Sequence, residues 1–327
     1  MKKVIISIIL VIVLVFSVAC NKETTDNQPE NAKEESRILN VAGLKGPTSM
    51  GMIKLIDSYH SNGNNKFKYT ILNSPKELIG KLVKEELDFA TVPTNMASII
   101  YQKTDGKYKL ANINTLNVLH MMSYEQVNSL KDLDGKTIYV SGKGATPEYV
   151  TRYLIEKSGL DIELNFKFDD HAALAKALIA GDVKNAILPQ PFVTTVTMKS
   201  EKVNRSFDLL NEWEKIENNS MLALGGLLIK SELIKNDPKI VNEFLDEYKK
   251  SVEFVNKDSE SASKLIKKYE ILPNEKIALK AIPNSNIVYK DISEVKERLN
   301  EYYKILFDFN KKSIGEKLPD DNFYYIR

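Results

Sequence analysis

Two glycine-containing turns, each directly before a helix pattern, carry the residue types best suited to hold a small polar ligand. The turns span residues 43–49 and 141–147. The first N–H groups of a helix have no partner inside the helix, and the helix dipole adds positive charge there. Glycine also lets the backbone come close to a ligand. The sequence therefore predicts contacts to an anionic or polar group at nine positions: Lys45, Gly46, Pro47, Thr48, Ser49, Ser141, Gly144, Ala145 and Thr146.

Polar residues that follow two proline-terminated strand patterns complete the predicted site. Thr94 and Asn95 come after Pro93, and Gln190 comes after Pro189. Open α/β sheets bind ligands at this edge. Four apolar residues are candidates for the wall of the same cleft: Met50, Met121, Tyr139 and Phe192. The simpler alternative is that the threonines and serines cap helices and that the apolar residues belong to the core.

Nothing in the sequence combines into a recognisable catalytic or metal-binding motif. His60, His120 and His171 lie far apart, and none belongs to a His-Glu-x-x-His pair. The turn at 141–147 lacks the spacing of a phosphate-binding loop, and no Gly-x-Ser-x-Gly elbow occurs. Cys20 is the only cysteine, so neither a disulfide framework nor a cysteine metal site can form. We therefore predict that the chain is not an enzyme and uses no metal or cofactor.

The elements that must position these turns occur twice along the chain. Residues 41–93 predict a strand, a glycine turn, a helix, a strand, a helix and a strand ended by proline. Residues 140–189 repeat the same order over nearly the same length. Parallel strands joined by helices put the glycine turns at the carboxyl edges of their sheets. The sequence thus predicts two similar α/β lobes whose facing edges form a cleft.

Local signals predict where individual helices begin and end. Ser74 followed by Pro75 predicts a helix start. Thr146, next to a proline, is expected to be the N-cap of a helix that ends near Gly159. The last third of the chain is helical in pattern, which indicates packing rather than ligand binding.

The first twenty residues have the pattern of a secretory leader. Lys2 and Lys3 precede an apolar stretch at 4–18, which is shorter than the roughly 20 residues that a membrane-spanning helix needs. The Ser-Val-Ala-Cys run that ends at Cys20 resembles a bacterial lipobox. That resemblance implies a signal peptide at 1–19 and a lipid-modified Cys20 as the mature N-terminus. A short anchor that is never cleaved is the alternative.

The segment at 20–36 has the composition of a linker. It is rich in Glu, Asn, Lys and Thr and contains no aromatic residue. Such a segment cannot bury enough apolar surface to fold, so it predicts a flexible tether. The whole chain carries a formal charge of +2, and cleavage before Cys20 leaves 44 basic against 44 acidic residues. A neutral protein lacks the positive surface that nucleic-acid binding requires, and we predict no nucleic-acid partner.

Parts of the second repeat resemble the substrate-binding proteins of ABC importers. Residues 130–138, Leu-Lys-Asp-Leu-Asp-Gly-Lys-Thr-Ile, are similar to a run found in that family, and residues 142–147 continue the similarity. Residues 180–192 resemble the family segment that ends in Glu-Pro-Phe. Lys184 stands where the family usually has Asp, and Gln190 stands where Glu is common. Sulfonate, nitrate, taurine and pyrimidine-precursor binding proteins are the members that the chain resembles.

The resemblance implies the type II periplasmic-binding fold: an α/β protein of two lobes, each a mixed sheet flanked by helices, with the ligand cleft between them. Lobe 1 would comprise residues 37–122 and 227–327, and lobe 2 residues 123–226. The resemblance also implies a monomer, lipid-anchored at the extracytoplasmic face of a bacterial membrane. Such a protein captures a small organic or anionic solute and delivers it to the permease and ATPase of an ABC transporter.

Two other functions remain open at the level of sequence. One is an enzyme on the same fold, since some relatives act in pyrimidine or menaquinone-precursor synthesis, although the cysteine-rich motif of the pyrimidine-making enzymes is absent. The other is a sensor lipoprotein that binds a ligand and signals to a partner protein. The residues do not decide among sulfonate, nitrate, pyrimidine-like and other heteroaromatic ligands.

Overall fold

The computed structural model describes residues 37–327 apart from 62–65, 73 and 219. The predicted signal peptide, the predicted lipidation site Cys20 and the predicted tether lie outside these residues. None of the helices in the described part is long and apolar enough to cross a membrane.

Six strands form the first sheet, in the order β11-β4-β10-β3-β1-β2. Their bounds are β1 Leu39–Leu44, β2 Phe67–Leu72, β3 Phe89–Pro93, β4 Tyr108–Thr115, β10 Gly225–Lys230 and β11 Ile287–Asp291. β1 pairs in parallel with β2 and β3, whereas β10 runs antiparallel between β3 and β4. The sheet is therefore mixed, and its parallel part β2-β1-β3 comes from the first predicted repeat.

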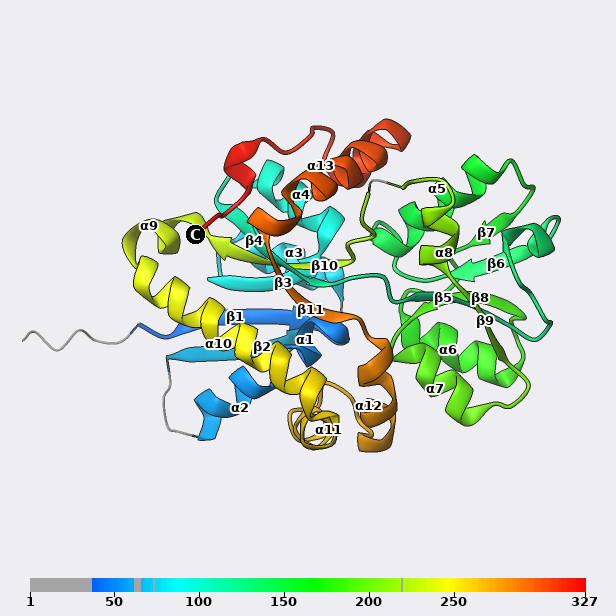
Figure 1. The fold of residues 1–327 in the computed structure, drawn as a ribbon, viewed down its shortest axis with the longest axis horizontal. Helices are drawn as coiled ribbons and strands as arrows, with labels where there is room; N and C mark the ends of the chain where they lie inside the picture. The colour runs from blue at the N-terminus through cyan, green and yellow to red at the C-terminus, as the bar shows by residue number, and fades with distance from the viewer. Residues whose placement is uncertain (1–36, 62–65, 73, 219) are drawn as a thin grey trace, which may run out of the picture. The chain divides into compact units, whose positions relative to one another are not determined.

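Five strands form the second sheet, in the order β7-β6-β8-β5-β9, drawn in shades of green in Figure 1. Their bounds are β5 Leu119–Ser123, β6 Thr137–Val140, β7 Glu163–Asn165, β8 Asn185–Pro189 and β9 Asn204–Asp208. β6 pairs in parallel with β7 and β8, and β5 is antiparallel to β8 and β9. The order β7-β6-β8 reproduces β2-β1-β3, which confirms the repeat, and the two mixed sheets flanked by helices confirm the predicted α/β fold class.

Thirteen α-helices of the described residues connect and cover these strands (Figure 1). Their bounds are α1 Pro47–Met50, α2 Ile53–Ser61, α3 Pro75–Val83, α4 Thr94–Lys103, α5 Thr146–Ser158, α6 His171–Ala180, α7 Phe192–Lys199, α8 Leu209–Glu214, α9 Ser231–Asn236, α10 Pro238–Lys257, α11 Ser259–Lys268, α12 Glu275–Ala281 and α13 Ile292–Phe309. A short 3-10 turn, η3, follows at Lys311–Ile314. The helical last third was predicted correctly.

The helix ends show where local sequence signals were sufficient and where they were not. Ser74 caps α3 as predicted, because its side chain accepts a hydrogen bond from the N–H of Glu77. α5 ends at Gly159, which adopts the left-handed conformation expected of a C-terminal glycine. The predicted N-cap role of Thr146 is wrong: Thr146 is the first residue of α5, and Ala145 precedes it without any side-chain cap. The Thr146 hydroxyl is used in a tertiary contact instead.

One hydrophobic cluster contains residues of both sheets. It joins the core beneath α3 and α4 to the residues that pack around α5 and α8. Two aromatic residues of α13 contribute to this junction. Phe309 contacts Tyr153 of α5 edge to face, and the ring centroids of Tyr302 and Trp213 of α8 are 5.9 Å apart. Separation of the two sheets along this side would expose large aromatic surfaces to water, which is unfavourable.

The chain passes from the first sheet to the second between β4 and β5 and returns between α8 and β10. Each crossing lies beside or within an apolar run of the sequence, at 116–122 and at 222–229. The predicted lobe boundaries, after residues 122 and 226, fall inside β5 and β10. The division into two lobes stays a prediction.

Candidate ligand-binding site

A cavity of about 130 Å³ lies where the carboxyl ends of the parallel strands of both sheets meet. Leu44 of β1 and Pro93 of β3 line it from the first sheet, and Gly142 after β6 and Pro189 of β8 line it from the second. About 10–15 Å³ on this measure is enough for one water molecule. The cavity therefore has room for a small organic molecule.

Seven of the twelve predicted ligand-contact residues line this cavity, and five do not. The lining residues are Lys45, Gly46, Pro47, Thr48, Ala145, Thr146 and Gln190. The residues away from its wall are Ser49, Thr94, Asn95, Ser141 and Gly144. Ligand contact itself stays a prediction for all twelve.

Residues 45–48 of the first glycine turn line the cavity, but Ser49 does not. Ser49 is buried: its hydroxyl donates to the Leu44 carbonyl and accepts from the Tyr69 hydroxyl at 2.7 Å. Gly43 lies against this pair and against the Thr91 hydroxyl, and a Cβ at Gly43 would collide with all three oxygens. Glycine is thus required here because three hydroxyl groups pack onto the end of β1.

The second glycine turn is held by the side chain of a residue in the helix that follows it. Gly142 and Gly144 have φ angles of 82° and 80°, a region that favours glycine. The N–H of Gly144 donates to Glu148 at 2.7 Å, and Glu148 also accepts from Arg152 at 2.8 Å. Gly144 therefore shapes the turn and lies behind the cavity wall, although its neighbour Ala145 lines it.

Asn95 connects the two halves of the site through its side-chain amide. Its Nδ2 donates to the carbonyl oxygens of Gly144 at 3.3 Å and Ser313 at 3.0 Å. Its Oδ1 accepts from the Thr146 hydroxyl at 3.0 Å. Both Asn95 and its neighbour Thr94 are fully buried. Because these bonds leave the amide engaged on both atoms, Asn95 links α4, η3 and the second glycine turn rather than facing the cavity.

Gln190, by contrast, lines both the cavity and an open hollow beside α7, and part of its amide is unused within the described residues. Its Oε1 accepts from the Thr194 N–H at 3.3 Å and from the Thr194 hydroxyl at 2.8 Å. Its Nε2 has no hydrogen-bond partner among the residues that the structure describes, and it is not one of the fully buried side-chain atoms that lack a partner. An accessible amide nitrogen can donate to a water molecule or to a solute. The Gln190 amide can supply one hydrogen bond to a bound solute.

His171 is a lining residue that was not among the predicted contacts. Its Nδ1 lies 2.6 Å from the Ser141 hydroxyl, and its ring centroid lies 5.5 Å from that of Phe192. Burial lowers the pKa of His171 to about 4, against a smaller opposing effect of Asp170. The imidazole is therefore neutral near pH 7. A usable signal was its position as the first residue of α6, at the same sheet edge as the glycine turns.

Of the four apolar residues suggested for the wall, only Phe192 lines the cavity. Met50 and Met121 are buried in the hydrophobic clusters of the sheets, and Tyr139 packs against the cluster beneath α6 and α7. Apolar side chains near a strand end are thus core residues here, as the simpler interpretation held.

The cavity wall carries little charge. Lys45 is its one charged residue within the described part of the chain, and its side chain is exposed. Among the residues that the structure describes, no Asp, Glu or Arg lines it. In addition, the described residues contain no group of three His, Cys, Asp or Glu side chains arranged to hold a metal ion.

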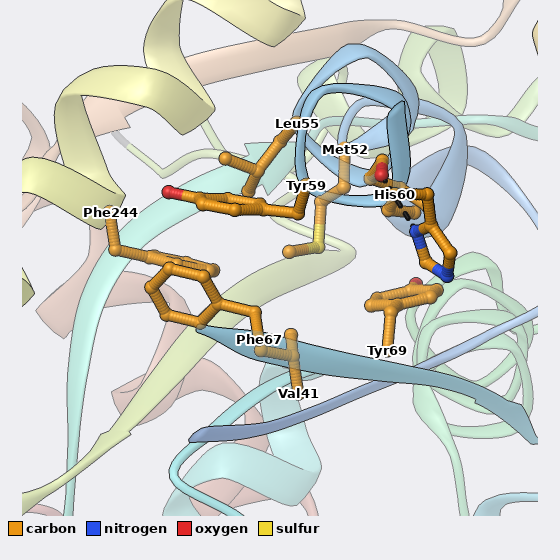
Figure 2. A pocket seen from close by; sticks show the side chains of 9 residues that line it. Val41, Met52, Leu55, Tyr59, His60, Phe67, Tyr69 and Phe244 are labelled. Carbon is orange, nitrogen blue, oxygen red and sulfur yellow. Dashed lines mark hydrogen bonds between the residues drawn. The ribbon is translucent and has the colours of Figure 1, made fainter. Parts of the chain in front are cut away.

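A second hollow, in the first sheet's outer core, is a packing defect rather than a site. It lies among Val41, Met52, Tyr59 and Phe67, and Figure 2 shows aromatic and sulfur-containing side chains closing around it. Its volume is about 10 Å³. Space for barely one water between apolar walls cannot hold a solute.

Comparisons with known proteins place this geometry in a family context. Residues 108–262 match the model of the family described as NMT1/THI5 like. No curated protein sequence matches the chain.

Solved structures match nearly all of the described chain. An ABC transporter protein from Parabacteroides distasonis is 22% identical with a TM-score of 0.73, over 88% of this chain and 98% of that one. The periplasmic aliphatic sulphonate binding protein SsuA from Escherichia coli is 13% identical with a TM-score of 0.70, over 88% and 92%. The periplasmic nitrate-binding protein NrtA from Synechocystis PCC 6803 is 12% identical with a TM-score of 0.63, over 88% and 83%.

These structural neighbours share the predicted architecture of two mixed sheets flanked by helices, with similarity that extends across both sheets. The chain therefore has the type II periplasmic-binding fold of the solute-binding proteins of ABC transporters, and its central segment is similar to NMT1/THI5-like proteins.

Proposed function

We propose that this chain is an extracytoplasmic solute-binding protein that captures a small molecule in the cavity between its sheets and delivers it to the permease of an ABC transporter. The neighbours named as ABC transporter, sulphonate-binding and nitrate-binding proteins support this role. A closed complex forms when contacts from both sheets favour it over the open state. The ATPase of the transporter supplies the energy of import, so the chain itself needs no catalytic group.

The observation that carries this proposal is the cavity itself. It is built from both sheets at the edge where α/β proteins bind ligands, and polar residues line it from both sides. Gln190 and His171 line it from the second sheet's side. Thr48 lines it from the first sheet's side. A solute that bonds to both sides would hold the two sheets together.

Attachment to the membrane is part of the proposal. The lipobox-like run predicts that Cys20 carries the lipid, and the segment at 20–36 would then let the folded part move near a permease. Replacement of Cys20 by Ser should leave the protein folded but shift it from the membrane fraction to the medium or periplasm. Retention of Cys20→Ser in the membrane fraction would contradict lipid anchoring without affecting the solute-binding role.

Solute capture is tested by thermal shift of the purified protein against sulfonates, nitrate, pyrimidines and vitamin precursors. A solute at about 100 times its Kd should stabilise the fold by about 2.7 kcal/mol. The stabilised compound should remain chemically unchanged after prolonged incubation, whereas its conversion would indicate an enzyme.

A matched pair of variants shows whether the compound binds in the cavity. Gln190→Ala should reduce the stabilisation to about half, because a tenfold weaker affinity leaves the solute at about 10 times its Kd, and Gln126→Ala, at an exposed amide, should retain it in full. Equal shifts in both variants would show that binding occurs elsewhere on the molecule.

A further inference from the structure

The cavity wall is poor in the backbone donors that an anion needs. Five of its lining residues are prolines: Pro47, Pro75, Pro93, Pro147 and Pro189. Proline has no N–H group. Three helices, α1, α3 and α5, begin at the cavity, and each has proline in its first two positions. The helix starts that would ordinarily offer free N–H groups to an oxyanion therefore each lack one here.

The start of the longest of these helices is already matched with a negative charge. The Glu148 carboxylate lies in the first turn of α5 and accepts the N–H of Gly144 at 2.7 Å. Glu148 is buried, and its charge is paired with Arg152 behind it. A carboxylate in this position stabilises the helix dipole and repels a second anion. A sulfonate or nitrate at this end of α5 would lie next to an internal negative charge.

Positive charge at the cavity is correspondingly weak. Lys45 is exposed and also lines an open hollow on the outer side, next to His60 and Tyr69, so water can solvate its ammonium group. An exposed ammonium contributes little to holding an anion. Burial also keeps His171 neutral near pH 7, as its lowered pKa indicates.

The remaining contacts suit an uncharged molecule with a flat body. Phe192 and His171 form a tilted ring pair on one side, and aliphatic side chains such as Val118 and Leu224 complete the wall. Gln190 also lines the cavity, and its Nε2 carries two N–H donors that have no partner among the described residues. Aromatic rings favour planar partners, and an amide N–H favours an acceptor such as a carbonyl or ring nitrogen.

We propose that the solute of this cavity is uncharged: a small, flat, largely apolar molecule with a hydrogen-bond acceptor for Gln190, not a sulfonate or nitrate. This inference rests on the proposed solute-binding function and narrows it. It also separates this chain from its sulphonate- and nitrate-binding structural neighbours, with which it shares the fold.

Matched ring compounds test the charge preference with the full-length protein in detergent. Calorimetric titration would use benzamide and nicotinamide, with benzoate, nicotinate and benzenesulfonate as charged counterparts, and sodium nitrate alone. The expected result is that an uncharged amide binds at least tenfold more tightly than its charged counterparts. Tighter binding of nitrate or of benzenesulfonate would overturn the inference and leave the proposed function standing. Absence of binding by every compound to a folded sample would count against the proposed function itself.

A charge-removing variant tests the physical cause. Glu148→Gln keeps an oxygen for the Gly144 N–H and leaves Arg152 without its anion, so benzenesulfonate should bind at least threefold more tightly. Benzamide affinity should change by less than twofold. Glu156→Gln, an exposed residue further along the same helix, is the matched control and should alter neither affinity. Unchanged benzenesulfonate affinity in Glu148→Gln would contradict the exclusion of anions by this carboxylate.

Discussion

Asn95 and Gln190 follow the proline-terminated strands of the two repeats, yet their amides serve different purposes. Asn95 is bonded on both side-chain atoms and links the first-sheet helix α4 to Gly144 and Thr146 at the second glycine turn. Gln190 lines the cavity, and within the described residues only its oxygen is bonded, to Thr194 at the start of α7. The Asn95 amide thus links the two sheets, whereas the Gln190 amide keeps a donor that a solute can use.

A second pair of contacts shows the same divergence. Each repeat joins a serine near its glycine turn to a ring: Ser49 to Tyr69 and Ser141 to His171. The Ser49–Tyr69 pair lies outside the cavity wall, whereas His171 lines the cavity. Both repeats therefore contain a serine–ring pair near the glycine turn, but the rings come from different elements and only His171 lines the cavity. Four predictions test this difference, from the largest expected effect to the smallest.

Loss of the Asn95 link should have the largest effect on stability. Asn95→Ala removes three hydrogen bonds and leaves buried partners unsatisfied, so we expect a loss of about 3 kcal/mol in the free energy of unfolding. Urea unfolding would measure it, with Asn128→Ala, at an exposed asparagine, as the matched control. A loss below about 1 kcal/mol would mean that the amide is not a structural link.

The ring pairs should differ in pH dependence. His171 has a folded pKa of about 4, so between pH 6.5 and 4 the unfolded chain binds a proton there that the folded chain does not. Stability should therefore fall as the pH drops through this window, by at most about 3 kcal/mol from this residue. Tyr69 contributes nothing there, because burial raises the pKa of its phenol further above 10.

His171→Asn isolates this effect in urea unfolding curves measured from pH 7 to 4. The variant should lose part of the pH-dependent fall and keep part of it, because burial also lowers the pKa of His120 to about 4. If the stability of the variant fell with pH as steeply as that of the parent protein, His171 would be protonated alike in the folded and unfolded states.

Removal of the Gln190 side-chain amide should affect solute binding more than the stability of the fold. Gln190→Ala should weaken the affinity for the most tightly bound uncharged solute by about tenfold, which corresponds to roughly 1.4 kcal/mol of binding free energy. Stability without solute should change by less than about 1 kcal/mol, because only the bonds to Thr194 are lost. Titration calorimetry and urea unfolding measure the two quantities separately. A reversed pattern, with intact binding and a large stability loss, would make Gln190 a structural residue like Asn95.

Replacement of Lys45 should have the smallest effect on solute affinity. Lys45→Ala should change the affinity for an uncharged solute by less than twofold, since its ammonium is exposed and water-accessible. Titration at low and moderate salt would measure it. A tenfold loss of solute affinity at low salt that disappears at high salt would indicate a charged solute. It would then be Lys45 of the first side, and not Gln190 of the second, that holds the solute.

Local sequence was sufficient to predict the strands and helices and their repetition along the chain. The caps at Ser74 and Gly159, the proline stops after β3 and β8, and the apolar periodicity follow from backbone preferences that act within a few residues. The resemblance of residues 130–192 led correctly to the fold class. The leader and Cys20 rest on sequence pattern alone.

Only the tertiary structure decided which polar residues reach the cavity. Thr146 was expected to cap its own helix, but its hydroxyl bonds to Asn95, 51 positions earlier. Ser49 and Ser141 lie in the predicted turns, yet Tyr69 and His171 hold their hydroxyls. The sequence alone determined that strands ending in glycine turns would meet at a ligand-prone edge, because that depends on chain direction and local geometry. Which side chains remain free there depends on partners far away in the chain, and these are set by packing between the two sheets.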